Sequence, residues 1–369
     1  MLKKFSVKGF KSFPDMLTLD LESKNNYEYN PEVIKDGLVN KGIIYGFNGC
    51  GKSNLGLAIF DIIILLTDKH KGIEDYYPYH NLDIPQNEPV EFEYTFLFED
   101  SELVYRYEKK GIDSLVNEYV SIDGKECIRY DFVKNTGYVR LKGAENLQIS
   151  DSGSGISRVR FVRNNCILEN THENSVFKEF LHFVDNMLMF YSLETNRFRG
   201  LNNSPSSISA AIIESGRIQD FEGFLHENHI DMNLESGEED GYPVLYAKYN
   251  NNNTRTDFFK VASTGTKALT LFYYWFIQMS KVSFVYMDEF DAFYHFELAE
   301  NIVNKLKQLT DTQIIMTTHN TDLLSNDLMR PDCYFWMDGM SIKALSQTTE
   351  KELRKAHNLQ KIFKAGGFQ

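Results

Sequence analysis

A glycine-rich loop between two apolar segments constrains this chain more than any other feature of its sequence. The loop has the spacing G-x-x-x-x-G-K-S over residues 46–53, preceded by "GIIYG" and followed by "SNLGLAIFDIIILL". The first segment predicts a short buried strand and the second predicts a helix. Glycines permit the turn that lets backbone N–H groups surround a polyphosphate, and the helix points its positive end at the same anion. Strand, loop and helix together predict a phosphate-binding loop (P-loop) rather than an ordinary glycine turn.

The polar residues of the P-loop have predicted contacts with ATP and Mg²⁺. Lys52 is expected to reach the β- and γ-phosphates, and the Ser53 hydroxyl is expected to hold the metal ion. The expected ATP-binding residues of this segment are Asn48, Gly49, Gly51, Lys52, Ser53 and Asn54.

The composition is that of an acidic globular protein with a substantial core. Of the 369 residues, 42% are hydrophobic and 14% are aromatic, which is enough for one large domain or two ordinary ones. The formal net charge of -13 opposes broad electrostatic binding of nucleic acid, although a local basic groove stays compatible with it. The cysteines are scattered without a C-x-x-C pair, which favours a reducing compartment and no zinc site. They are Cys50, Cys127, Cys166 and Cys333.

The sequence predicts no membrane segment. The longest apolar run, "LGLAIFDIIILL", contains Asp61 and is too short to span a bilayer. The opening "MLKKFSVKGF" alternates apolar and polar residues like a strand and lacks the long apolar core of a secretory signal. We therefore expect a soluble, cytoplasmic protein.

Hydrophobic patterns divide the chain into segments of different predicted structure. Residues 2–21 predict two strands around a turn, and residues 90–142 predict a meander of antiparallel strands. Residues 170–230 predict mostly helices. Residues 150–165, with three arginines, predict a loop, and the acidic residues 233–241 predict a turn. Further predicted elements are a hairpin over residues 242–261 and a basic C-terminal helix over residues 350–369.

An apolar strand that ends in two acidic residues is expected to complete the nucleotide site. In "KVSFVYMDEFD", residues 281–291, the strand ends at Asp288 and Glu289. Ligands of open α/β sheets bind at the carboxyl ends of strands. Asp288 is therefore expected to hold Mg²⁺ with Ser53, and Glu289 to orient or deprotonate the attacking water. The alternative is a solvated acidic turn, which the P-loop disfavours.

A second apolar strand, in "TQIIMTTHN" at residues 312–320, ends in His319. An imidazole at this place is expected to hydrogen-bond the γ-phosphate or the attacking water, so His319 is a catalytic candidate beside Glu289. His226 and His229 lie three positions apart on a predicted helix. We interpret them as two ordinary histidines rather than as a metal pair.

Residues 261–275, "VASTGTKALTLFYYW", predict a helix that begins beside small polar residues. Ser263 and Thr264 are residue types that cap a helix, so this is a second helix N-terminus able to receive an anion. A simple capped helix is the alternative for this segment taken alone.

Together, "GFNGCGKS" at 46–53, "STGTK" at 263–267, "MDEFD" at 287–291 and His319 resemble the motifs of ABC-type ATPases of the SMC and OLD type. Within that superfamily the chain resembles the AAA15/AAA21 group, stand-alone ATPases of which many are linked to bacterial anti-phage defence. The resemblance implies an α/β fold of the P-loop NTPase, ABC-ATPase type, with a mixed sheet around the P-loop helix. The implied organisation is a single discontinuous domain over residues 1–369, with a core at 1–67 and 257–345, an antiparallel β subdomain at 90–142, and an inserted helical lobe at 165–240.

The resemblance also implies nucleotide contacts outside the P-loop. The opening "VKGFKSF" resembles the N-terminal strand and turn of the superfamily, so Lys11 and Ser12 are expected to approach the nucleotide. "STGTK" resembles the signature motif, so Ser263, Gly265 and Lys267 are expected to complete the active site of the opposite subunit. Its difference from the transporter sequence "LSGGQ" argues against a transporter subunit.

The resemblance also implies positions for three further residues. "DEFDAFYH" is similar to a stretch of the AAA15/AAA21 group that places Asp291 in a dimer-facing loop, with His295 nearby. Gln148 is the candidate for the glutamine of the Q-loop.

The expected function is a slow ATPase in which two subunits enclose two ATP molecules, as a homodimer or a higher even oligomer. Long heptad repeats and a clustered acidic triad after His319 are missing from the sequence, so we expect the ATPase to regulate a separate effector protein as a sensor. The alternative is a clamp that binds DNA or RNA itself through Arg158, Arg160, Arg163 and the C-terminal helix. A metabolic kinase is disfavoured because it leaves the Ser263 segment and His319 without a role.

Overall fold

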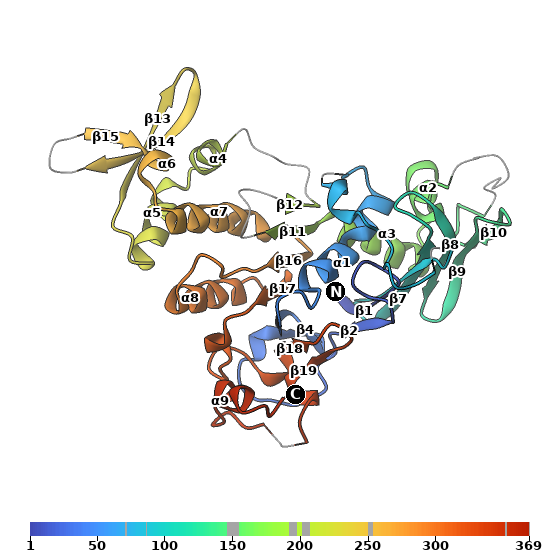
Figure 1. Ribbon diagram of the computed structural model, residues 1–369. Helices are drawn as coiled ribbons and strands as arrows, with labels where there is room; N and C mark the ends of the chain where they lie inside the picture. Colours follow the sequence, from blue (N-terminus) through green and yellow to red (C-terminus); the bar gives the residue numbers. More distant parts are fainter. Residues whose placement is uncertain are drawn as a thin grey trace.

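Two large sheets lie on either side of one central helix, α1 (Lys52–Leu66), and a smaller sheet projects from the body (Figure 1). The computed structural model describes residues 1–70, 72–85, 87–145, 155–191, 198–200, 207–249, 254–350 and 353–368.

The core sheet is mostly parallel and carries the P-loop. Its order is β12-β11-β16-β17-β5-β18-β19; the strands from β11 to β18 are parallel to their neighbours, and both edge strands are antiparallel. Every residue of β5, β16 and β17 is buried, as expected for strands covered on both faces. The bounds are β5 (Lys41–Gly46), β11 (Met187–Tyr191), β12 (Phe198–Arg199), β16 (Phe284–Asp288), β17 (Gln313–Thr318), β18 (Tyr334–Met337) and β19 (Ile342–Ala344).

The second large sheet is antiparallel, in the order β10-β9-β8-β7-β6-β1-β2. It confirms the two predicted N-terminal strands and the predicted meander. Burial alternates along β7, because one face of the sheet packs inward and the other faces solvent. The bounds are β1 (Leu2–Lys8), β2 (Leu17–Asp20), β6 (Val90–Phe98), β7 (Ser101–Lys109), β8 (Leu115–Ile122), β9 (Lys125–Asp131) and β10 (Thr136–Val139).

Helix α1 is buried along most of its length because both large sheets pack against it. From the antiparallel sheet, the Tyr94 hydroxyl donates to the Ala58 carbonyl at 3.0 Å. From the core sheet, Tyr286 packs so closely that a Cβ on Gly56 would lie 2.6 Å from its ring. The predicted fold class, a mixed α/β fold with a mixed sheet around the P-loop helix and an antiparallel β subdomain, is thereby confirmed. No helix in the described residues is long and apolar enough to cross a membrane.

A carboxylate, Asp61, lies inside this apolar packing. Its two oxygens accept from Lys109 Nζ at 2.9 and 3.1 Å, from the Tyr107 hydroxyl at 2.9 Å and from the Tyr79 hydroxyl at 2.8 Å. The side chains of Asp61 and Lys109 are both 0% exposed. A buried charge is tolerated only where it is paired and hydrogen-bonded, so this network fixes the middle of α1 against β7.

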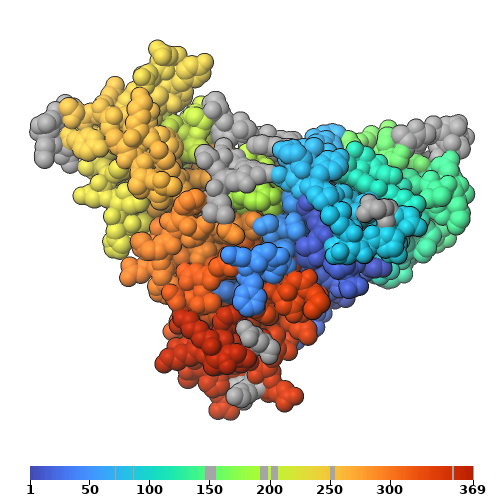
Figure 2. All heavy atoms as spheres, in the orientation of Figure 1, coloured from blue at the N-terminus to red at the C-terminus, as the bar shows by residue number. Residues whose placement is uncertain are grey.

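The remaining elements cover the sheets or form the projecting unit. Helix α3 packs on the inner face of the antiparallel sheet, where the ring of Phe180 lies 5.3 Å from that of Phe96. Strands β13, β14 and β15 form a three-stranded sheet that projects from the body beside α4 and α5 (yellow in Figure 2). The bounds are β3 (Ile34–Lys35), β4 (Leu38–Val39), α2 (Arg158–Asn165), α3 (His172–Asp185), α4 (Ile208–Glu214), α5 (Ile218–Glu227), β13 (Asn233–Glu239), β14 (Tyr242–Tyr249), β15 (Thr254–Asp257), α6 (Phe258–Val261), α7 (Thr264–Met279), α8 (Phe296–Lys307) and α9 (Leu359–Lys364).

The prediction of mostly helical structure over residues 170–230 is wrong at β11, which belongs to the core sheet. The run "MLMFY" is wholly apolar, and periodicity cannot distinguish a short buried strand of this kind from a helix segment. Pairing decides the conformation: Met187 lies opposite Phe284, and Tyr191 lies opposite Asp288. The division of the chain into one discontinuous domain with an inserted lobe stays a prediction.

Two predictions of irregular structure are also wrong. Residues 233–239 form strand β13, paired with β14, and the turn follows at Asp240 and Gly241, whose φ values are 53° and 82°. Arg158–Asn165 form helix α2 rather than a loop, because the Ser157 side chain caps the helix by accepting from a backbone N–H.

The predicted C-terminal helix is shorter than expected. Helix α9 spans only Leu359–Lys364. Leu359 is buried, and the ring of Phe363 lies 5.0 Å from that of Trp336 in the core sheet. The segment therefore packs on its own domain.

The Asp61 network yields a prediction about stability. Replacing Lys109 by Met leaves the Asp61 carboxylate buried without its cation, so the free energy of unfolding should fall by about 3–5 kcal/mol. Urea unfolding followed by circular dichroism measures the change. Lys125→Met is the matched control, because Lys125 forms an exposed pair with Glu173 and should change stability little. Equal effects of the two variants would contradict this account of the network.

Candidate nucleotide-binding site

The predicted motif residues converge at one edge of the core sheet. Strands β16, β17 and β5 are parallel neighbours, and they end at Asp288, Thr318 and Gly46. Because the carboxyl ends of adjacent parallel strands lie at the same edge, residues far apart in the sequence meet beside the P-loop.

Two glycines give the P-loop its shape. A Cβ on Gly46 would lie 2.5 Å from the Met337 carbonyl oxygen, so the end of β5 has no room for a side chain. Gly51 has a φ of 104°, and a Cβ there would lie 2.7 Å from Ser12 Oγ. Helix α1 then begins at Lys52, with its free N–H groups at the loop.

Lys52 lies at the centre of the loop. Its Nζ donates to the carbonyl oxygens of Gly46 at 3.0 Å and Phe47 at 3.3 Å. His319 Nε2 lies 3.0 Å from the same Nζ. Burial lowers the pKa of Lys52. The pKa of His319 is also lowered, mainly by burial and next by the positive charge of Lys52. The structure thus brings together the predicted lysine and the predicted histidine.

Ser53 contacts the acidic strand end directly. Its hydroxyl donates to Asp288 Oδ2 at 2.6 Å. The Tyr286 hydroxyl, from the same strand as Asp288, donates to the Lys52 carbonyl at 2.6 Å and fixes the first turn of α1. A hydroxyl and a carboxylate are hard oxygen ligands of the kind that Mg²⁺ binds, so the donor set fits that ion.

Glu289 follows in a left-handed backbone conformation, with a φ of 48°. Its carboxylate Oε1 lies 3.8 Å from His319 Nε2. Its backbone N–H donates to Thr317 Oγ1 at 2.8 Å, and the same hydroxyl donates to Asp288 Oδ1 at 2.8 Å. Thr317 was not among the predicted site residues; the only signal for it in the sequence is a hydroxyl residue near the end of a strand that is otherwise mostly apolar.

The N-terminal turn reaches the P-loop through one of its two predicted residues. Ser12 Oγ accepts from Asn54 Nδ2 at 2.9 Å. Lys11 has a φ of 45°, and its Nζ donates to the carbonyl oxygens of Tyr77 at 3.4 Å and Pro78 at 3.3 Å. Ser12 is therefore at the loop, whereas the Lys11 amine is held by the 77–78 segment.

Asn48 and Gly49 form the exposed crest of the P-loop, and Gly49 has a φ of 78°. Phe47 beside them is 64% exposed, and its ring lies edge-on to Trp336 at 5.1 Å. The crest is thus open to a ligand, with an aromatic pair at its side.

The signature-like segment lies at the start of α7 and outside the Lys52 site of its own chain. Ser263 Oγ accepts from the Thr266 backbone N–H at 3.1 Å, which confirms the predicted cap. Ser263, Thr264 and Lys267 are exposed and Gly265 is half-buried. Within the described part of the chain, the hydrogen bonds of this segment do not reach the P-loop.

The loop after Glu289 leads from β16 to α8 in the chain, and it contacts α7 on the way. The Tyr294 hydroxyl donates to the Ala268 carbonyl at 3.1 Å. Burial raises the pKa of Asp291, and its backbone carbonyl accepts from Tyr294 N at 2.9 Å. His295 caps α8, with Nδ1 accepting from the Leu298 N–H at 3.4 Å.

The other candidate residues lie elsewhere. His226 is near the end of α5 and His229 is beyond it, with a φ of 61°. In the residues that the structure describes, no three His, Cys, Asp or Glu side chains form a group that could hold a metal ion. Gln148 lies outside the described residues.

The three arginines of the alternative nucleic-acid site make contacts within the chain. Arg158 is 3% exposed, and its Cζ lies 4.0 Å from the Tyr130 ring centroid. Arg160 pairs with Asp68, and Arg163 pairs with Asp185 at 2.9 Å. These arginines therefore do not form the exposed basic groove that the alternative requires.

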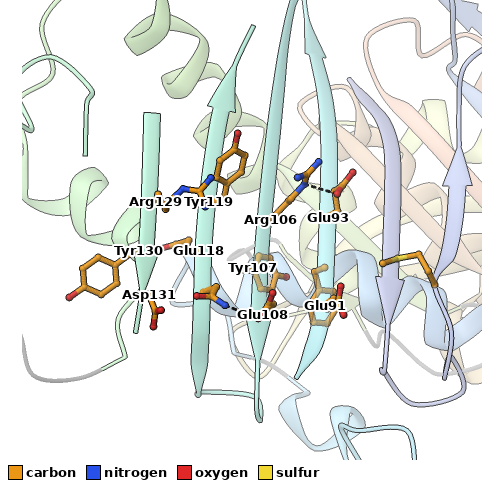
Figure 3. A pocket seen from close by; sticks show the side chains of 13 residues that line it. Glu91, Glu93, Arg106, Tyr107, Glu108, Glu118, Tyr119, Arg129, Tyr130 and Asp131 are labelled. Carbon is orange, nitrogen blue, oxygen red and sulfur yellow. Dashed lines mark hydrogen bonds and ion pairs between the residues drawn. The ribbon is translucent and has the colours of Figure 1, made fainter. Parts of the chain in front are cut away.

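A separate pocket of about 470 Å³ lies on the outer face of the antiparallel sheet (Figure 3). Charged and aromatic side chains of neighbouring strands lie side by side in it. Arg106 Nε pairs with Glu93 at 2.6 Å, and the Cζ of Arg129 lies 5.1 Å from the Tyr119 ring centroid. Its lining residues come from β6 to β9 and Met16, so the pocket is distinct from the P-loop site.

Comparison with solved structures finds low identity. Similar structures include an SMC head domain from Thermotoga maritima (16% identity, TM-score 0.48, 93% of this chain and 98% of that chain). They also include an SMC head bound to the C-winged helix domain of ScpA (17% identity, TM-score 0.48, 93% of this chain and 96% of that chain). A third is an SMC head domain with an extended coiled coil, bound to the C-terminal domain of ScpA and derived from Pyrococcus furiosus (14% identity, TM-score 0.41, 93% of this chain and 95% of that chain). Among curated proteins, none matches the chain.

A family model gives the assignment. Residues 43–325 match AAA_21, whose description reads "AAA domain, putative AbiEii toxin, Type IV TA system". This match spans the P-loop, the Ser263 segment, Asp288 and His319, and it confirms the resemblance to the AAA15/AAA21 group. Since the matched region covers more than half of the chain, the protein belongs to the AAA_21 family of P-loop ATPases.

Proposed function

We propose that this protein binds and hydrolyses ATP, closes as a dimer around the nucleotide, and thereby regulates a separate effector. The observation that carries the proposal is the meeting of three sequence segments: the P-loop, the acidic end of β16 and the end of β17 with His319. Lys52 Nζ lies 3.0 Å from His319 Nε2, and Ser53 Oγ lies 2.6 Å from Asp288 Oδ2. This arrangement combines a phosphate-binding cation, hard oxygen ligands and a carboxylate beside an imidazole.

Nucleotide binding is assigned to the loop and the start of α1. The Lys52 ammonium, which now donates to two loop carbonyls, lies where it can transfer its hydrogen bonds to the β- and γ-phosphates. Exposed Asn48 and Gly49 leave the loop crest accessible, and the N-terminus of α1 adds backbone donors.

Mg²⁺ is assigned to the Ser53 hydroxyl and the Asp288 carboxylate, which are already in contact. When bound, the ion neutralises charge on the phosphate oxygens. Asp288 has one oxygen directed to Ser53 and the other to Thr317, so its orientation is set before the nucleotide arrives.

Hydrolysis is assigned to Glu289 and His319. The carboxylate accepts a proton from the attacking water as a general base. A neutral His319 accepts a hydrogen bond from Lys52 and lies 3.8 Å from Glu289, where it can orient the water or contact the γ-phosphate.

The dimer is proposed because Ser263, Gly265 and Lys267 lie outside the site of their own chain. A second subunit would present this helix N-terminus to the γ-phosphate across the interface. Hydrolysis would be slow, since it waits for both halves to meet. The proposed assembly is a homodimer or a higher even oligomer.

The proposed effector is a second polypeptide, in the context of anti-phage defence. The family description names a toxin of a type IV toxin–antitoxin system, which supports a role in a two-component system. ATP would shift the population of a closed dimer, and the effector would read that state. The proposed location is the cytoplasm.

Replacing Glu289 by Gln should trap the closed state. The variant keeps the shape of the side chain but loses the base, so hydrolysis should fall about 100-fold or more while ATP stays bound. Native mass determination with MgATP should give a dimer or a multiple of it, with the effector attached when the neighbouring genes are co-expressed.

Gly265→Arg, added to Glu289→Gln, is the control for the interface. It places a bulky cation on the signature-like helix start and should return the protein to a monomer in MgATP. A monomer for Glu289→Gln itself, with and without ATP, would contradict the two-subunit arrangement.

Replacing Ser53 by Ala removes one of the two proposed metal ligands. The Mg²⁺ concentration for half-maximal hydrolysis should rise at least about tenfold, since even outer-shell changes cost metal affinity by this factor. Ser53→Thr keeps the hydroxyl and should behave like the wild type. An unchanged Mg²⁺ requirement in Ser53→Ala would remove Ser53 from the metal site.

The lowered pKa of His319 predicts the direction of a pH effect. Because the folded-state pKa lies below the ordinary value of about 6.5, the unfolded chain binds more protons in this window, and His319 should reduce stability as the pH falls below about 6.5. His319→Gln should lose less stability between pH 7 and pH 5 in urea unfolding. An imidazole NMR titration midpoint above 6.5 would contradict the assigned environment.

A further inference from the structure

Thr317 lies between the two acidic residues of the proposed site and is fully buried, at 0% exposure. It is the last residue but one of β17, two positions before His319. Side chains two positions apart on a strand lie on the same face, so the Thr317 hydroxyl is on the side of the strand from which His319 follows.

Three contacts join Thr317 to the end of β16. Its hydroxyl donates to Asp288 Oδ1 at 2.8 Å and accepts from the Glu289 N–H at 2.8 Å. Its backbone carbonyl accepts from the Phe290 N–H at 3.1 Å. One residue of β17 therefore holds the side chain of Asp288 and two consecutive peptide groups after it.

We infer that Thr317 is the positioning residue that sets both carboxylates of this site for hydrolysis. The inference rests on the proposed ATPase function and deepens it, because it names the group that fixes the proposed metal ligand and the proposed base at once.

The first part of the argument concerns the Asp288 carboxylate. Oδ1 is occupied by the Thr317 hydroxyl, and Oδ2 is occupied by the Ser53 hydroxyl. The carboxylate plane is therefore fixed from both sides. Without the Thr317 hydroxyl, Oδ1 loses a charge-assisted hydrogen bond and the group can rotate away from the direction in which a metal ion would be held.

The second part concerns the turn at Glu289. A non-glycine residue with a φ of 48° adopts a conformation that is rarely populated unless neighbouring groups hold it. The Glu289 N–H and the Phe290 N–H both donate to Thr317, and these bonds hold the turn. With the turn held in this way, Glu289 Oε1 lies 3.8 Å from His319 Nε2.

The test compares Thr317→Val with Thr317→Ser. Valine keeps the shape and the burial but removes the hydroxyl, whereas serine keeps the hydroxyl. In steady-state ATPase assays of the full chain, kcat of Thr317→Val should fall about 10- to 100-fold while KM for ATP changes little, because one hydrogen bond to a charged group is lost. The Mg²⁺ concentration for half-maximal rate should also rise. Thr317→Ser should recover most of the rate.

Thr312→Val is the matched control. Thr312 is buried just before β17, and its hydroxyl donates to the Met279 carbonyl at 2.7 Å, away from both carboxylates. It should lower the melting temperature about as much as Thr317→Val and leave kcat near the wild-type value.

Three results would overturn the positioning role: an unchanged kcat in Thr317→Val, equal losses in the Val and Ser variants, or an equal loss of kcat in Thr312→Val. Each of these leaves an active wild-type enzyme, so the proposed function would stand. A wild-type protein that hydrolyses no ATP would instead overturn the proposed function, and the positioning role with it.

Discussion

The packing of helix α1 between two sheets determines where the P-loop can lie. The helix is apolar on all sides, so it is stable only when both the core sheet and the antiparallel sheet cover it. Asp61 and Lys109 fix its middle against one sheet, and the Tyr286 hydroxyl fixes its first turn against the other. The loop before α1 is consequently held at a rigid helix end, which is where a phosphate group meets free N–H donors.

The same packing brings the chemical groups together. Strands β16 and β17 lie next to β5 in a parallel register, so Asp288 and the segment leading to His319 end beside the P-loop. Gly46 and Gly51 have no side chain, and a Cβ at either position would lie only 2.5 Å or 2.7 Å from a neighbouring atom, so the loop can take this shape only with glycine there. The site is therefore a consequence of strand order, and substitutions that shift β17 would disturb the lysine, the histidine and the acidic pair together.

Electrostatics within the site favour a neutral histidine next to a lysine. Burial and the Lys52 charge both lower the pKa of His319, so the imidazole can accept a hydrogen bond at neutral pH. In the proposed dimer, the exposed start of α7 would add a second set of N–H donors from the partner. The projecting β13–β15 unit precedes α7 in the chain and leads into it through α6.

Local patterns in the sequence were enough to predict the P-loop, the two N-terminal strands, the meander and the acidic strand end, because each depends on glycines, alternation or apolar runs. The sequence also predicted that Ser53 and Asp288 share one metal site and that His319 lies near the γ-phosphate, since strand ends of a parallel sheet converge. Tertiary structure alone decided that Met187–Tyr191 is a strand, because five apolar residues fit a helix or a strand until β16 pairs with them. It also decided that Lys11 contacts the 77–78 segment, that Arg158 is buried, and that Thr317 joins both carboxylates, since these depend on contacts between residues far apart in the chain.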